Sequence, residues 1–128
     1  MRWKLLSIVV GVATCVMPLT GVANAGTLAD TAVTIRTANG DFWGFVSSPR
    51  PLRCADGRKV VLFKQTGPEQ DPRADERVAS DTASLNGDRY EWNTGNTGMF
   101  GRFYARVART DTCRGDTSNT IRSVRPKT

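Results

Sequence analysis

The feature that most constrains the fold is a series of short, extended runs separated by turn residues. The clearest run is Arg58 to Gln65, in which Val60 and Leu62 share one face of a strand. Asn39-Gly40 and Asn86-Gly87 are hairpin-type turn sequences. No window after the first 25 residues keeps a helical period. The pattern therefore predicts an all-β chain.

Seven strands are expected, with turns every 8 to 12 residues, and this spacing is typical of a single antiparallel β-sandwich. The predicted domain covers residues 26–124, followed by a basic tail over 125–128 that we expect to fray. Loops are predicted over Thr66 to Glu76 and over Thr94 to Gly101. The predicted strands are Val33 to Thr37, Phe42 to Ser47, Arg58 to Gln65, Arg77 to Thr82, Arg89 to Asn93, Arg102 to Arg109 and Thr120 to Val124.

The first 25 residues have the pattern of a signal peptide. Arg2 and Lys4 precede an apolar stretch, and Ala23-Asn24-Ala25 is a small-residue cleavage site, which predicts processing before Gly26 and secretion. A membrane-spanning helix needs about 20 apolar residues, and this apolar stretch is shorter, so no span is expected after processing. A retained anchor helix and lipidation at Cys15 are the alternatives.

Two cysteines, Cys54 and Cys113, remain in the processed chain, and an even count in an exported domain favours one disulfide. Two separate buried thiols are the alternative. The whole chain carries net charge +6, which falls to +4 when Arg2 and Lys4 are removed. This excess is spread along the sequence, so a nucleic-acid partner is not expected.

Several motifs resemble an exported bacterial domain with a transthyretin-like or carboxypeptidase-regulatory-like sandwich. They are the runs 44–48, 58–63, 78–81 and 101–107, the turn 86–87 and the closing segment 118–121. The resemblance covers about Phe42 to Val124. It implies a seven-stranded sandwich of transthyretin-like or immunoglobulin-like type with a Cys54–Cys113 bridge, and it implies no activity.

The residues offer little for catalysis. The chain contains no histidine, which removes the commonest general base and metal ligand. The carboxylates Asp81, Asp88 and Glu91 surround a predicted hairpin rather than a cleft. We therefore expect no enzyme, no catalytic residue, no cofactor and no metal.

Three further motifs have a functional and a simpler interpretation. A Lys–Asn crosslink would need Lys59 or Lys64 near Asn119 and Glu91, but solvated side chains are the simpler expectation. Arg114-Gly115-Asp116 is a weak cell-attachment tripeptide and also ordinary turn chemistry. The acidic set Glu69, Asp71, Asp75 and Glu76 suggests calcium, but interleaved arginines favour a solvent-facing loop.

Aromatic residues are the remaining candidates for a site. Trp43 and Phe45 share a strand face opposite another apolar face, and Phe63 and Tyr104 repeat this arrangement on their own strands. These four residues form the predicted binding face, unless loops cover it. The leading hypothesis is a secreted, non-enzymatic binding or structural module for an extracellular protein or polysaccharide. The alternatives are a carbohydrate-binding module, and a small hydrolase or protease inhibitor whose active loop lies within Thr66 to Glu76.

Overall fold

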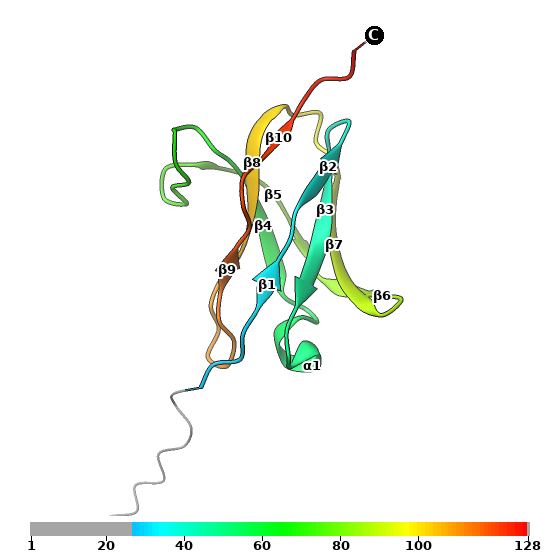
Figure 1. Ribbon diagram of the computed structural model, residues 1–128, viewed down its shortest axis with the longest axis vertical. Coiled ribbons are helices and arrows are strands. Elements are labelled where there is room, and N and C mark those ends of the chain that lie inside the picture. Colours follow the sequence, from blue (N-terminus) through cyan, green and yellow to red (C-terminus); the bar gives the residue numbers. More distant parts are fainter. Residues whose placement is uncertain (1–26, 128) are drawn as a thin grey trace, which may run out of the picture.

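A computed structural model describes residues 27–127, so the predicted signal peptide lies outside the described residues. Two antiparallel sheets face each other as a β-sandwich (Figure 1). Sheet 1 has the order β1-β3-β7-β6, with β2 also on β3, and sheet 2 has the order β10-β8-β4-β5, with β9 also on β8. The strands are β1 (Ala32–Val33), β2 (Arg36–Ala38), β3 (Asp41–Ser47), β4 (Lys59–Lys64), β5 (Glu76–Thr82), β6 (Ser84–Asn86), β7 (Arg89–Asn96), β8 (Gly101–Val107), β9 (Asp116–Thr117) and β10 (Ile121–Ser123).

The all-β prediction is confirmed, but the described residues form ten strands rather than seven. Each predicted strand overlaps an observed one. The first predicted strand is divided into β1 and β2, which pair with different parts of β3. The short strands β6 and β9 were not predicted, because neither has an alternating pattern. Strand β7 continues to Asn96, into the segment expected to be a loop.

One short helix, α1 (Pro51–Cys54), was also not predicted. Proline at the first helical position is favourable because its missing N–H has no helical partner there and its φ is preset. The helix places Cys54 and Ala55 in the interior at one end of the sandwich, where both are fully buried.

Strands β5 and β6 follow each other directly and link the two sheets, since β5 pairs with β4 in sheet 2 and β6 pairs with β7 in sheet 1. The change of sheet occurs at Ala83, which is 1% exposed. The backbone of Ala83 donates to the Arg58 carbonyl at 2.8 Å and accepts from Gly57 at 2.9 Å. These bonds hold the crossing against the start of β4.

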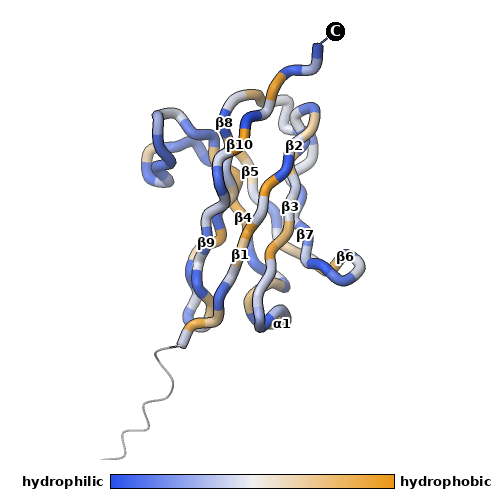
Figure 2. Tube along the Cα trace, in the orientation of Figure 1, coloured by the Kyte–Doolittle hydropathy of each residue, from blue (hydrophilic) through white to orange (hydrophobic). Residues whose placement is uncertain are grey.

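The core lies between the sheets. Phe42 of sheet 1 packs against Phe103 of sheet 2 with ring centroids 4.6 Å apart. Figure 2 shows apolar segments along the strands, whereas the loop between β4 and β5 is hydrophilic. Other buried apolar side chains are Val33, Ile35, Val46, Val60, Leu62, Trp92, Ala105 and Val107.

Trp92 is fixed in this core by a close approach of two chain segments. Its Nε1 donates to the Thr34 carbonyl at 3.0 Å. A Cβ on Gly44 would lie 1.9 Å from the same carbonyl oxygen and 2.8 Å from Trp92 Nε1. Glycine at position 44 is therefore required by space rather than by backbone conformation.

None of the helices within residues 27–127 has the length and apolar character needed to cross a membrane.

Candidate functional site

The outer surface of sheet 1 carries two of the predicted aromatic residues. Along β3 the buried side chains of Phe42, Gly44 and Val46 alternate with those of Trp43 and Phe45, which are half-buried and face away from the core. We call this surface, centred on Trp43 and Phe45, the aromatic face.

Polar side chains surround the aromatic face, because the strand register sets them beside the rings. Trp43 lies opposite Arg36 of β2 and Asn93 of β7. Phe45 lies opposite Glu91 of β7, whose carboxylate accepts from Asn86 Nδ2 at 2.9 Å. Directly paired residues share a face, so guanidinium, amide and carboxylate groups border both rings.

A groove of about 430 Å³ continues the aromatic face toward α1. Phe45, Tyr90 and Pro51 give it apolar walls, and Asp88 and Arg89, which also line it, supply opposite charges. The Arg89 guanidinium lies 4.9 Å from the centroid of the Phe45 ring, a cation–π distance. The groove thus combines apolar surface with a few polar groups, as small-ligand sites commonly do.

The other two residues of the predicted binding face, Phe63 and Tyr104, do not join Trp43 and Phe45, which corrects the four-residue prediction. They lie on the outer side of sheet 2 and are 1% and 0% exposed. Their rings stack on each other with centroids 5.2 Å apart. For Phe63 and Tyr104, therefore, the alternative expectation holds: a loop covers these outward-facing aromatic side chains.

The covering loop, between β4 and β5, is fastened by one carboxylate. Asp75 accepts hydrogen bonds from the backbone and hydroxyl of Thr66, both at 3.0 Å, and from the backbone of Asp71 at 2.8 Å. The Tyr104 hydroxyl donates to the same carboxylate at 2.6 Å. The Tyr104 bond is the main cause that lowers the pKa of Asp75 to about 2. Burial is the main cause that raises the pKa of the Tyr104 hydroxyl, and the hydrogen bond to Asp75 is the second cause.

The acidic set proposed for calcium does not assemble. In the part of the chain that the structure describes, no group of three or more acidic, histidine or cysteine side chains is placed to hold a metal ion. Asp75 is directed into the loop hydrogen bonds, whereas Glu69, Asp71 and Glu76 are exposed.

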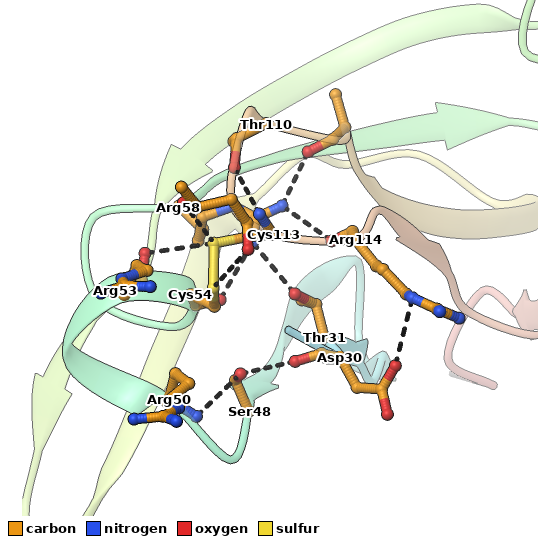
Figure 3. The surroundings of a disulfide bond; sticks show 12 residues. Asp30, Thr31, Ser48, Arg50, Arg53, Cys54, Arg58, Thr110, Cys113 and Arg114 are labelled. Atoms are coloured by element: carbon orange, nitrogen blue, oxygen red, sulfur yellow. Dashed lines mark hydrogen bonds and ion pairs between the residues drawn. A yellow bond between two sulfur atoms is a disulfide. The ribbon is translucent and has the colours of Figure 1, made fainter. Parts of the chain in front are cut away.

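The predicted disulfide is present at the α1 end of the sandwich (Figure 3). Cys54 and Cys113 lie 59 residues apart in sequence, with their Cα atoms separated by 5.5 Å. Both cysteines are buried. Disulfides of this kind are expected in an oxidising compartment.

Arg58 forms the centre of the same region, a role that sequence reasoning missed. Its side chain, 5% exposed, donates to the Thr31 hydroxyl at 3.0 Å and the Cys54 carbonyl at 3.1 Å. It also donates to the carbonyls of Ala108 at 2.7 Å and Arg114 at 3.2 Å. Figure 3 shows this guanidinium beside the bridge. Burial lowers the pKa of Arg58.

The tripeptide Arg114-Gly115-Asp116 lies in this network rather than on a free loop. Arg114 Nε is 3.5 Å from Asp30 Oδ1, and the Asp116 carboxylate accepts from the backbone of Val33 at 2.8 Å. Asp116 is also part of β9. Its carboxylate therefore joins the edges of the two sheets.

The remaining candidates are dispersed. The Asp81 carboxylate accepts from the backbone of Asn93 at 2.7 Å, and Asp88 lines the groove. Lys59 and Lys64 belong to β4, where Lys59 is exposed and Lys64 is half-buried. Asn119 is exposed between β9 and β10.

The sequence matches no known protein-family model and no curated protein.

Proposed function

We propose that this protein is a secreted, non-enzymatic β-sandwich module that binds its partner through the aromatic face and the adjoining groove. The observation that carries the proposal is the half-exposure of Trp43 and Phe45 on the outer surface of sheet 1, while Phe63 and Tyr104 of sheet 2 are fully covered. Rigid aromatic side chains provide large contact area at low entropic cost, and they are enriched at binding surfaces.

The sheet order supports a finer proposal about the fold. If β1 and β2 count as one strand, β9 and β10 as one and β5 and β6 as one, the sandwich has seven strands. We letter these seven strands A to G in chain order. Sheet 1 then has the order A-B-E-D and sheet 2 contains strands C, F and G, which is the immunoglobulin arrangement. We propose this class, and the resemblance to transthyretin-like exported domains remains a prediction.

A polysaccharide is the ligand class that we favour for the aromatic face. Sugars present apolar ring faces and peripheral hydroxyls. Trp43 and Phe45 offer surfaces for stacking, and Arg36, Glu91 and Asn93 border them as hydrogen-bonding groups. An inhibitor role for the loop between β4 and β5 ranks lower, because this loop has a packing role over Phe63 and Tyr104.

Co-sedimentation with insoluble cellulose, chitin and peptidoglycan tests the polysaccharide proposal. We expect the processed wild-type protein to sediment with at least one polymer and the Trp43→Ala variant to stay in the supernatant. Phe100→Ala removes a half-buried aromatic side chain away from the face and should behave as wild type. Failure of wild type to sediment with any of the three polymers would contradict the sugar proposal.

A further inference from the structure

A row of apolar side chains runs from the core to the free edge of sheet 1, in the hairpin formed by β6 and β7. Val46 of β3 pairs with Tyr90 of β7, and Tyr90 pairs with Leu85 of β6. Directly paired residues share a face of the sheet, so these three side chains form one row. Val46 is buried and Tyr90 is half-buried, whereas Leu85 is 60% exposed. In the described residues no strand pairs with the other side of β6, so the row ends at an exposed apolar side chain.

The backbone of Leu85 also points to this free edge. The hairpin has the two-residue loop Gly87–Asp88, in which Gly87 has a φ of 67°. The residues that flank such a loop, here Asn86 and Arg89, exchange backbone hydrogen bonds with each other. Backbone groups alternate in direction along a strand, so the N–H and C=O of Leu85 point away from β7.

The hydrogen bonds of Ala83 lead to the same conclusion. Its N–H and C=O bond to Arg58 and Gly57, on the side away from β7. Leu85 lies two residues further and therefore presents its backbone groups in the same direction. Among residues 27–127 no backbone group bonds to Leu85 on that side. Figure 1 shows the hairpin projecting from the body of the sandwich.

Two other strand edges carry features that prevent pairing with further strands. Strand β5, at one edge of sheet 2, contains a bulge and three charged side chains, Glu76, Arg77 and Asp81. At the other edge of sheet 1, the N–H of Val33 is already bonded to the Asp116 carboxylate. Charges, bulges and covered backbone groups are common protections of an edge. Strand β6 has the sequence Ser-Leu-Asn, without a charge, a proline or a bulge, so its edge is open to pairing.

We propose that this edge is a self-association surface, at which β6 pairs antiparallel with β6 of a second copy of the chain. A two-fold axis at Leu85 lets the N–H of each Leu85 donate to the carbonyl of the other. Ser84 of one copy then lies opposite Asn86 of the other, so no like charges face each other. The two Leu85 side chains meet on one face, and the apolar row continues from one core to the other.

A second copy is the occupant that fits this edge because the edge is its own complement. Leu85 supplies a donor, an acceptor and an apolar side chain, and the two-fold axis brings the same three features from the other copy. Only three residues of each strand face each other, so the interface is small and the association is expected to be weak and dependent on protein concentration.

Pairing of this kind has a consequence that rests on the proposed function. The two-fold axis is perpendicular to the joined sheet, so the two aromatic faces point to the same side. One polymer can then contact both faces, which strengthens binding without a new contact. The self-association itself does not depend on the ligand.

Sedimentation velocity of the processed protein, from micromolar to millimolar concentration, tests the association. The sedimentation coefficient of wild type should rise with concentration. Leu85→Lys, which sets like charges opposite each other, should stay monomeric throughout. The matched control is Leu52→Lys, because Leu52 of α1 is even more exposed, at 81%, and should associate as wild type does. Trp43→Ala should also associate as wild type does, which separates this proposal from the sugar proposal.

Crosslinking captures a weak pair. The Cα atoms of residues that exchange hydrogen bonds across antiparallel strands lie about 5.5 Å apart, within the range of a disulfide. Leu85→Cys should therefore form a covalent dimer under mild oxidation, and Leu52→Cys should form far less. A wild-type protein that stays monomeric at every concentration would overturn the proposal, and so would equal crosslinking of the two cysteine variants.

Discussion

Replacement of Arg58 by methionine should be among the most damaging single changes in the protein. Methionine fills similar space but donates no hydrogen bond, so the two buried partners of Arg58, the Thr31 hydroxyl and the Cys54 carbonyl, lose the donor that Arg58 provides. Each buried acceptor left unpaired costs about 1–3 kcal/mol. Two such groups give a loss of at least about 2 kcal/mol, which corresponds to a fall of about 10 °C in melting temperature for a domain of this size.

Thermal unfolding followed by circular dichroism measures this effect, and Arg53→Met is the control. Arg53 belongs to α1 and is exposed, so its replacement removes the same charge close by without stranding these two groups. We expect Arg53→Met to melt within about 3 °C of wild type, as exposed substitutions do. If Arg58→Met also melted within this margin, the guanidinium would not organise the disulfide end, and the reasoning would be wrong.

Three further changes test the fold. Gly44→Ala should lose about 3 kcal/mol of stability, because the new Cβ would lie 1.9 Å from a carbonyl oxygen. Gly67→Ala should be tolerated, because the space around Gly67 is open. Urea denaturation distinguishes the two variants. The C54A/C113A variant should lose about 4 kcal/mol in the same assay, as expected for a link 59 residues apart, and equal stability would contradict this. The Asp75 carboxylate, with its pKa lowered to about 2, should stabilise the protein above pH about 4, and this stability should disappear as the pH falls toward 2. Asp75→Asn should therefore flatten the dependence of the urea midpoint on pH in this interval, and an unchanged slope would exclude the carboxylate as the cause.

The sequence predicted the strands that alternate apolar and polar residues, because burial of one face imposes a period of two. Strand β4 is the clearest case, with Val60 and Leu62 both buried as expected. The short strands β6 and β9 could not be predicted in this way, because each forms only where a neighbouring strand offers free backbone groups. Their existence depends on tertiary pairing rather than on local composition.

The candidate site was only half predictable for a similar reason. Alternation placed Trp43, Phe45, Phe63 and Tyr104 on outer faces, and the structure agrees for all four. What the pattern lacks is the loop fastened by Asp75, which covers only the second pair.

Retention of the processed protein on the insoluble surface material of the producing cells tests the role of the aromatic face most directly. Wild type should sediment with this material, and the W43A/F45A variant should remain soluble while melting as a folded protein in the same buffer. The Phe100→Ala variant should sediment as wild type does. Equal sedimentation of wild type and W43A/F45A, or failure of wild type to sediment at all, would contradict binding through this face.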